Sequence, residues 1–596
     1  MAKPYLHCHR RFKNGKEHCY YSIAEKVKTR RGWVQRHLLY LGEINDSQKA
    51  SWTKATEVFD PVLRQMRELA LYPADRPVPE HAMDYGVQVR LDQFELHRPR
   101  QWGACWVACQ LWDQLKLDEF WRERLADSRE GTCWRHVLQS LVTYQLIDPG
   151  SEWRLHREWF KNSALADLLD EDFSLVQKDT LYRCLDKVLE HRQELFKHLR
   201  QRWEDLFGVK FEVLLYDLTS TYFESDPPFG QSDKRKYGYS RDKRSDCVQV
   251  IIALVVTPEG FPLAYEVMAG NTSDKTTLRA FLEQIEKLYG KAQRIWVMDR
   301  GIPTEEVLAE MRAHEPPVQY LVGTPKGRLS RYEKQLTELP WQVVREGVKV
   351  KLLSEDNELY VLAQSTDRVS KERSMRRRQL KALVKRLKEL QTMELPRDQV
   401  LLKLGAAKQQ FPSAWRLMTV EIPQANTVTE GQNFSFKLRT EKLRQVRRRE
   451  GRYLLRSNLT GEDPARLWQF YVQLTQIEAA FKDLKDDLGL RPIFHQLERR
   501  IEAHIFVAFM AYCLHVHLRA RLRALAPGLT PRSLLEKFSA IQMLDVHFPT
   551  TDGRQLVFAR YTQPEKDHKM LLSQLGWELP PQSPPRITQK GNLLQV

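Results

Sequence analysis

Two aspartates stand at the ends of apolar runs, where an ionised side chain is costly. Asp217 follows the run VLLY and precedes Thr219, Ser220 and Thr221, and Asp299 follows the run IWVM. A charged group at the end of a buried strand needs a partner or a coordinated cation. Each acid taken singly is explained equally well as a cap on a turn. Two of them on separate strands of one sheet favour a metal site.

A third carboxylate occurs much later, in the segment YVQLTQIEAAFKDLK at residues 471–485. Glu478 stands at the border of the apolar stripe of this amphipathic helix, which is an unusual place for a charge. Two turns of an α-helix take about seven residues, so Tyr471 and Lys485 lie on the same side as Glu478. The alternative interpretation is an exposed Glu478 that forms an ordinary salt bridge with Lys482 at i+4.

The three acids have the chemistry of a site for two divalent ions. Hard oxygen ligands with open coordination positions suit Mg²⁺ or Mn²⁺. Two such ions about 4 Å apart activate a water or a 3′-hydroxyl and stabilise the leaving oxygen in an in-line attack on a phosphodiester. We therefore expect metal-dependent cleavage of a nucleic-acid backbone, with two ions per site held by Asp217, Asp299 and Glu478.

Changes in periodicity divide the chain into six segments and predict a multi-domain α/β protein. The central part shows three strands, then helix, strand, helix, strand, which is the order of an RNase H-like core with a mixed sheet, although other α/β folds share it. The segments are 1–45, a β-rich N-terminal DNA-binding unit; 46–205, a helical DNA-binding domain; 206–325, the first part of the core; 326–458, a β-rich insertion; 459–530, the core helices; and 531–596, a C-terminal helical segment with a tail that we expect to be disordered.

Composition points to a polyanion as partner. The 596 residues carry a net charge of +17 and give a pI near 9.3, which attracts nucleic acid without determining a fold. The longest apolar run, IFVAFMAYCL, is about half the length that a membrane-spanning helix needs, and the N-terminus lacks a signal-peptide core. Eight cysteines without CxxC pairs indicate reduced thiols. We expect a cytoplasmic protein with no membrane partner.

One cluster of histidines and cysteines, HCHRRFKNGKEHC at residues 7–19, surrounds an Asn-Gly turn. A two-residue hairpin there pairs Cys8 with Tyr21 and Cys19 with Arg10, so the two thiols become diagonal neighbours on one face. The geometry of this hairpin would allow a zinc site, but the spacing of its cysteines and histidines is not a standard zinc-ligand spacing. Half-buried thiols without a metal are the favoured interpretation.

The motifs together resemble a known family. They are YDLTSTYFE with Asp217, MDRG with Asp299, the helix at 471–485, and the segments GYSRDKRSD at 238–246, GNTSDKTTL at 270–278 and EGRYLLRSN at 450–458. Over about 210–515 the chain resembles bacterial insertion-sequence transposases of the Asp-Asp-Glu type, in the group with a Tyr-Arg-Glu-Lys signature helix. Tyr471, Glu478 and Lys485 match that signature, and Leu474 occupies the place of its arginine.

The resemblance implies an RNase H-like core that binds two divalent ions through the three acids and carries a β-rich insertion between the second and the third. It implies that Tyr471 and Lys485 contact DNA phosphate near the cleaved end. Lys482 or another cation would replace the missing arginine as a phosphate ligand, although lysine is a poorer bidentate donor. Cut-and-paste transposition through a hairpin intermediate is the mechanism that this group implies.

Three basic segments are candidates for contact with DNA. Cations interleaved with tyrosines follow the first core strand, and two denser runs lie in the insertion, where family members hold transposon ends. An exposed loop or a solvated helix face is the alternative for each. The candidate residues are Lys234, Arg235, Lys236, Arg241, Lys243, Arg244, Arg376, Arg377, Arg378, Arg447, Arg448 and Arg449. The acids Asp242, Asp246 and Asp274 lie in family segments, but capping of loops and helices explains them.

We therefore expect a DNA transposase that binds the terminal inverted repeats of its own insertion sequence, cleaves them and transfers the 3′ ends to target DNA. It would act as a homodimer on double-stranded DNA, in the bacterial cytoplasm at the nucleoid. Two alternatives stay open: a metal-dependent nuclease of the same core that does not join strands, and a catalytically silent DNA-binding regulator. Retention of three costly carboxylates argues against the regulator.

Overall fold

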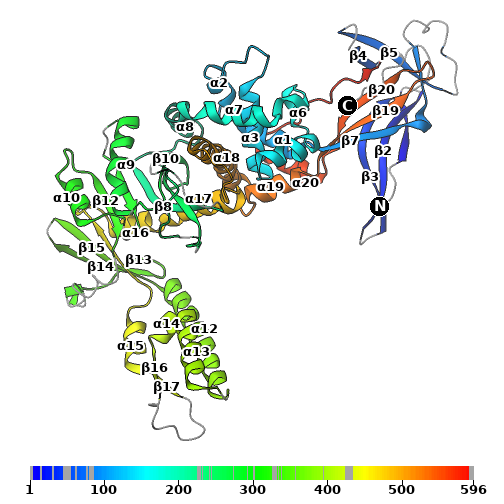
Figure 1. The fold of residues 1–596 in the computed structure, drawn as a ribbon. Coiled ribbons are helices and arrows are strands. Elements are labelled where there is room, and N and C mark those ends of the chain that lie inside the picture. Colours follow the sequence, from blue (N-terminus) through cyan, green and yellow to red (C-terminus); the bar gives the residue numbers. More distant parts are fainter. Residues whose placement is uncertain are drawn as a thin grey trace.

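The computed structural model shows a multi-domain α/β protein with mixed sheets and many helices (Figure 1). A three-stranded and a seven-stranded sheet lie at one end, a helical module in the middle and the largest sheet at the other end. The structure describes residues 5–13, 16–29, 32–43, 56–60, 64–74, 78, 86–224, 230, 233–240, 242, 244–272, 274–290, 293–299, 302–324, 332, 335–336, 338–355, 357–393, 395–422 and 434–588.

The largest sheet has nine strands in the order β10-β9-β8-β11-β12-β18-β15-β14-β13. Three antiparallel strands, β8, β9 and β10, come first in the chain, and β11 then lies parallel to both β8 and β12. Helices α9 (Asp274–Tyr289) and α10 (Glu305–Ala313) make the connections on either side of β11. The bounds are β8 Val213–Phe223, β9 Val248–Val256, β10 Pro262–Ala269, β11 Ile295–Met298 and β12 Gln319–Gly323.

The remaining four strands come from the segment 326–458 and extend this sheet. Strand β18 pairs antiparallel with both β12 and β15, and β15, β14 and β13 follow as antiparallel neighbours. Main-chain pairing therefore ties both ends of the insertion to the core. The bounds are β13 Gln342–Arg345, β14 Val348–Glu355, β15 Glu358–Ser365 and β18 Arg452–Ser457.

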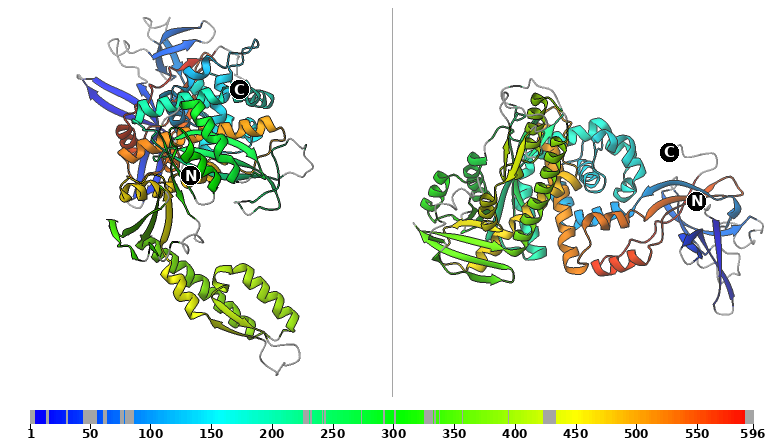
Figure 2. Two further views of the ribbon diagram at one scale, coloured as in Figure 1. Left: turned by 90° about the vertical axis from the view of Figure 1, so that its left-hand side faces the viewer. Right: turned by 90° about the horizontal axis from the view of Figure 1, so that it is seen from below.

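Between β15 and β18 the chain forms a lobe that projects from the sheet (Figure 2, left). We expected a β-rich insertion here, but the lobe is mainly helical, with one two-stranded sheet. The sequence predicts a basic helix at 370–390, and this segment lies within α12. Helix α13 is the unexpected one, because its apolar residues occur on both its buried and its exposed side and do not show a clear helical period. The lobe contains α12 Thr366–Gln391, α13 Arg397–Gln410, α14 Pro412–Trp415, β16 Met418–Glu421, β17 Ser435–Leu438 and α15 Thr440–Arg448.

The long helix α18 (Glu498–Leu525) joins the core to the helical module. It packs against α1 (Gly103–Gln114), α3 (Trp134–Ile147) and α7 (Lys178–Val188), and the module and the sheet share one apolar cluster. By length and composition α18 would suffice to cross a membrane, but 94% of its most apolar 18-residue window is buried inside the protein. Its apolar surface on all sides is that of a central core helix.

The seven-stranded sheet corrects the expected bounds of two helical regions. We predicted a helical domain at 46–205 and a helical segment with a tail at 531–596, but both regions also supply strands, which pair in the order β6-β5-β4-β21-β20-β19-β7. The pairing partners lie at opposite ends of the chain, so local periodicity does not reveal them. Its members are β4 Thr56–Asp60, β5 Gln65–Pro73, β6 Gly86–Val89, β7 Glu95–Gln101, β19 Gln542–Pro549, β20 Gln555–Tyr561 and β21 Arg586–Ile587.

The proline-rich stretch PPQSPP at 580–585 is ordered, contrary to our expectation. The Tyr561 hydroxyl donates to the Pro580 carbonyl at 2.5 Å, and the Phe59 amide donates to the Pro585 carbonyl at 2.9 Å. Helices α19 (Pro531–Phe538) and α20 (Lys566–Leu575) occupy the same region. Proline restricts the chain without excluding it from a fold, and these hydrogen bonds fix the segment on the sheet.

The first three strands form a separate antiparallel sheet of β1 (Tyr5–Lys13), β2 (Lys16–Thr29) and β3 (Gly32–Glu43). Ile23 and Leu39 from this sheet share an apolar cluster with Val546 and Phe558 of the seven-stranded sheet. The two sheets are therefore packed together at the end of the molecule that contains both termini.

A buried ionic network holds the extension of the large sheet against α10. Glu358 of β15 accepts hydrogen bonds from Arg312 at 2.8 Å, from Arg456 at 2.7 Å and from the Tyr320 hydroxyl. Arg456 also pairs with Glu305 at 2.7 Å. Glu358 and Arg456 are 3% and 6% exposed, so each depends on the other to compensate its charge.

We predict that Glu358→Ala lowers the free energy of unfolding by about 3 kcal/mol or more, because it leaves the Arg456 guanidinium buried without its main counter-charge. Urea denaturation measures the change. Glu310→Ala is the control, since Glu310 pairs with Arg279 on the surface and its loss should cost less than about 1 kcal/mol. Equal losses in the two variants would contradict the importance of the buried network.

Candidate active site

The register of β8 and β11 brings the first two predicted acids together. The paired residues run from Val213 with Ile295 to Tyr216 with Met298, so Asp217 and Asp299 are the next residues on the two strands. Neighbouring strands lie about 5 Å apart, and paired residues of parallel strands face the same side of the sheet. Strand β8 continues beyond this point, whereas β11 ends at Met298. The two partly buried carboxylates therefore lie at an edge where the sheet opens.

The helix that carries the third acid is broken rather than continuous. Helix α16 (Pro464–Val472) ends before Gln473, and α17 (Leu474–Lys482) is followed by a π-helical turn at Asp483–Asp487. The Gln473 amide donates to the Phe470 carbonyl at 3.1 Å, an i−3 bond that tightens the chain at the break. Gln473 itself keeps helical backbone angles, and its amide also donates to the Gln469 carbonyl at 3.3 Å, so the break is local.

Helix α17 nevertheless packs over the strands of the two aspartates. It lies against β8 and β9 through its buried face, and α16 lies against β11 and β12. Glu478 is on the exposed side of α17. Its charge acts on Tyr453 at the start of β18: burial, and then the carboxylates of Glu372 and Glu478, raise the pKa of the Tyr453 phenol, against the lowering effect of Arg368.

The donor set fits two hard divalent cations, although the three acids are not gathered tightly. Among the described residues, the groups whose ligand atoms all lie within 4.8 Å of one another do not include Asp217, Asp299 and Glu478. Three carboxylates without a cation repel one another, and a pair of ions about 4 Å apart needs ligands spread around both. Asp217 lies on β8, Asp299 follows the neighbouring strand β11, and Glu478 lies on the helix that packs against β8, so the three carboxylates belong to adjoining elements.

The other signature residues have partners in the protein. Tyr471 is half buried and its ring contacts those of Trp468 and Tyr453, at centroid distances of 6.1 and 5.7 Å. Leu474, in the place of the arginine, is buried in the shared core. Burial raises the pKa of Asp483, at the end of α17, to about 6, although its partner Arg519 opposes the shift.

Lys485 takes part in an ion-pair cluster that the sequence did not reveal. The carboxylate of Asp242 accepts from the Lys485 ammonium at 2.8 Å and from the Arg491 guanidinium at 2.5 Å. Both Asp242 and Lys485 have side chains that are 9% exposed. Asp242 therefore fastens the segment 238–246 to the signature helix, a role that spacing in the sequence could not show because the pairs join distant segments.

The basic segment after β8 is largely engaged within the protein. Arg235 is 5% exposed and pairs with Asp233 at 2.7 Å, and Lys234 pairs with Glu502. Lys236 donates to the Gly230 carbonyl at 3.4 Å, and Arg244 pairs with Glu224 and Asp246. Arg241 and Lys243 lie outside the described residues. Of this segment, Arg235 is buried too deeply to meet DNA without rearrangement.

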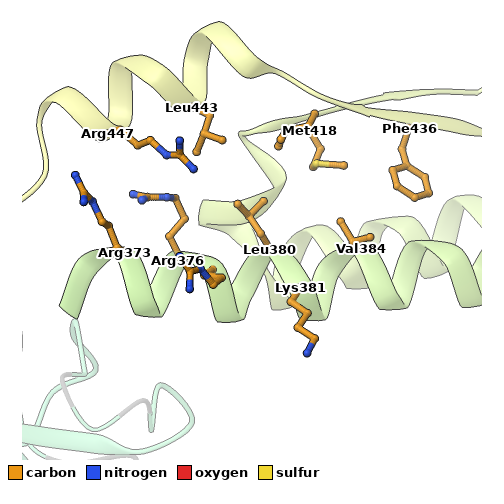
Figure 3. A pocket seen from close by; sticks show the side chains of 11 residues that line it. Arg373, Arg376, Leu380, Lys381, Val384, Met418, Phe436, Leu443 and Arg447 are labelled. Carbon is orange, nitrogen blue, oxygen red and sulfur yellow. The ribbon is translucent and has the colours of Figure 1, made fainter. Parts of the chain in front are cut away.

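The basic residues of the lobe are more accessible and line a groove of about 800 Å³ between α12, α15 and the β16–β17 pair. In Figure 3, Arg373 and Arg376 of α12 point toward Arg447 of α15, and apolar side chains line the other end. Burial and the neighbouring Arg447 and Arg373 lower the pKa of Arg376, which also pairs with Glu450. The remaining candidates of the lobe are exposed: Arg377, Arg378, Arg448 and Arg449.

The N-terminal cluster forms the hairpin that the sequence predicted, with Cys8 opposite Tyr21 and Cys19 opposite Arg10. Cys8 is exposed and Cys19 is half buried, and neither forms a disulfide. Neither residue belongs to a three-ligand group in the part of the chain that the structure describes.

Comparison with known protein families identifies the family to which the core of this chain belongs. The family described as "Transposase DDE domain" matches residues 209–514, which include the nine-stranded sheet, the lobe and most of α18. The chain belongs to this transposase family. Its matched range nearly coincides with 210–515, over which the sequence motifs resemble Asp-Asp-Glu transposases. A DDE transposase is an enzyme that breaks phosphodiester bonds with divalent metal ions.

Other comparisons add less. No curated protein matches the transposase sequence. Among solved structures, a piggyBac transposase synaptic complex with hairpin DNA, determined by cryo-electron microscopy, aligns over 73% of this chain and 76% of its own, with 8% sequence identity and a TM-score of 0.32.

We predict that Asp242→Asn destabilises the transposase by about 2 kcal/mol or more, because the nearly buried Lys485 ammonium and the partly buried Arg491 guanidinium lose their shared anion. The control is Asp486→Asn, since Asp486 pairs with the same Arg491 at 3.0 Å but is 49% exposed, and its loss should cost less than about 1 kcal/mol. Urea denaturation measures both variants. A smaller loss for Asp242→Asn than for Asp486→Asn would contradict the anchoring role of Asp242.

Proposed function

We propose that this protein is the transposase of a bacterial insertion sequence, which cleaves DNA at the terminal inverted repeats of its element and transfers the 3′ ends to target DNA. The main support is the parallel register of β8 and β11, in which Asp299 comes next to Asp217. Membership of the transposase family supplies the class of reaction.

We assign the order β10-β9-β8-β11-β12 to an RNase H-like core. Three antiparallel strands followed by two parallel ones support the assignment, as does the position of both acids at one edge of the sheet. In open α/β sheets, active sites lie at the ends of strands, because side chains there reach solvent while the strands remain rigid.

Asp217, Asp299 and Glu478 would hold two Mg²⁺ or Mn²⁺ ions, since carboxylate oxygens are the ligands that these hard cations prefer. When bound, the ions activate a water or a 3′-hydroxyl and stabilise the leaving oxygen of the phosphodiester. The chain itself fixes two carboxylates on adjacent strands and carries the third on a helix packed against β8. Exposure of Glu478 leaves that carboxylate accessible to ions that arrive with DNA.

The DNA backbone would lie along the signature helix and the lobe. Lys482 is exposed beside Glu478 and is our candidate for the phosphate contact of the missing arginine. Tyr471 and Lys485 would support that contact near the cleaved end, together with Lys234, Lys236 and Arg244. The accessible arginines of the lobe would hold the transposon end, because exposed cations along one groove attract DNA phosphates. We expect one active site in each subunit of a cytoplasmic homodimer.

The decisive experiment is cleavage of the element's own end sequences by purified protein with Mg²⁺. Glu478→Gln should lose about 100-fold or more of the cleavage rate, because several kcal/mol of transition-state stabilisation depend on the ions that it would hold. Gel-shift assays should show that its DNA affinity is retained.

Glu536→Gln is the matched control, since Glu536 is an exposed acid on α19 and its removal should leave cleavage unchanged. Equal cleavage by wild type and Glu478→Gln would remove Glu478 from the site. Ends that are cut by the wild type but never joined to target DNA would identify a nuclease in place of a transposase.

A second prediction concerns the lobe. Arg447→Ala should weaken binding to all DNA sequences to a similar extent and reduce the slope of log affinity against log salt by about one, because one phosphate contact is lost. Lys569→Ala, at an exposed position of α20, removes the same charge away from the lobe and should leave the slope unchanged. Identical slopes for the two variants would exclude Arg447 from the interface.

A further inference from the structure

Three side chains with metal-binding atoms converge where the helical module meets α18. Glu152, at the start of the short helix α4 (Glu152–Arg154), lies 2.8 Å from His495 Nε2 and 3.4 Å from His504 Nδ1, both measured to its Oε1 atom. All three residues are 8% exposed. Their ligand atoms lie within 4.8 Å of one another. None of them belongs to the proposed catalytic site.

The separations suit a small tetrahedral ion. Zinc binds imidazole nitrogen and carboxylate oxygen at about 2.0–2.2 Å, which puts neighbouring ligand atoms about 3.3 Å apart. The observed 2.8 and 3.4 Å differ from that spacing by a few tenths of an ångström. Two histidines and one glutamate are a common zinc set, and a water completes the tetrahedron.

His504 faces Glu152 with its Nδ1 atom. The other ring nitrogen, Nε2, is buried and has no hydrogen-bond partner among the described residues. An ion on Nδ1 would leave Nε2 unchanged, so the convergence of three buried ligand atoms is the observation that indicates a metal.

Two other groups of three ligand residues are weaker candidates. Asp483, Asp487 and His515 are accompanied by cations, because Arg519 lies 2.6 Å from Asp483 and would compete with a metal. Cys133, His136 and Glu171 include two partly exposed residues. The cluster of Glu152 combines full burial with no arginine or lysine paired to its carboxylate among the described ion pairs.

We propose that Glu152, His495 and His504 bind one structural zinc ion. The ion would join the helical module to α18 and to the segment that follows the helix of Glu478. Two neighbouring contacts already bring these parts together: Gln145 donates to the Leu488 carbonyl, and Gly489 lies so close to Pro149 that a Cβ atom there would come within 2.8 Å of it. Zinc would hold this junction rigid.

The test uses the full chain, purified without a histidine tag, and measures zinc by mass spectrometry and thermal unfolding with and without a chelator. We expect about one zinc per chain in the wild type and less than about one tenth in His504→Gln. Chelation should lower the unfolding midpoint of the wild type by several degrees and leave that of His504→Gln unchanged.

The matched control is His136→Gln, which alters the half-exposed group of Cys133 and Glu171 and should retain the zinc. Cobalt provides a readout that needs no variant, because Co²⁺ added to the chelated wild type should give the visible absorption of a tetrahedral site. Wild-type protein that holds no zinc and binds no Co²⁺ would overturn the proposal and leave a set of charge-assisted hydrogen bonds. Loss of zinc in His136→Gln but not in His504→Gln would assign the metal to the other group. Neither result depends on DNA cleavage.

Discussion

Strand β11 pairs with β8 in parallel and in a single register, and it ends one residue before Asp299, whereas β8 runs on through Asp217 for the rest of its eleven residues. A slip of one residue would turn Asp217 to the opposite face of the sheet and separate the two carboxylates. The register is secured on its other side by β9, which is buried along its whole length. The position of the acids, the packing of α17 and the extension of the sheet toward the lobe all depend on this pairing.

Helix α18 fixes the helical module against the core. Because its apolar surface is buried by the helical module on one side and by the core on the other, the two parts share one hydrophobic core. Separation of the two would expose many large apolar side chains to water. The module that we expect to bind DNA is therefore held in a fixed orientation to the sheet edge, which a flexible linker would not provide.

The excess of positive charge is divided between two kinds of position. Arg456, Arg235 and Lys485 are nearly buried, and each is matched by a carboxylate that the fold brings to it. The charges of Arg456 and Arg235 contribute to the folded structure rather than to attraction of a polyanion, and the charge of Lys485 is shared with Asp242. The exposed arginines of α12 and α15 are crowded together on the lobe, where repulsion between them favours an anion. Net charge alone does not distinguish these groups, because burial and partners decide which cations remain available.

The sequence by itself indicated the elements of the core and its family. Acids after the runs VLLY and IWVM indicated strand ends, the order of elements in 206–325 indicated a mixed sheet, and the joint motifs indicated the transposase family, because each of these signals is local. The Asn-Gly turn likewise determined the register of the first hairpin.

Tertiary structure alone decided whatever depends on contacts between distant segments. Three contacts join residues that are hundreds of positions apart. They are the pairing of β7 with β19, the ion pair of Lys485 with Asp242, and the contact of Glu152 with His495 and His504. Periodicity reports the burial of one face and not the identity of what covers it, so these contacts leave no pattern in the sequence. The break in the helix at Gln473 also leaves no pattern in the sequence, because the amphipathic spacing of apolar residues continues through it.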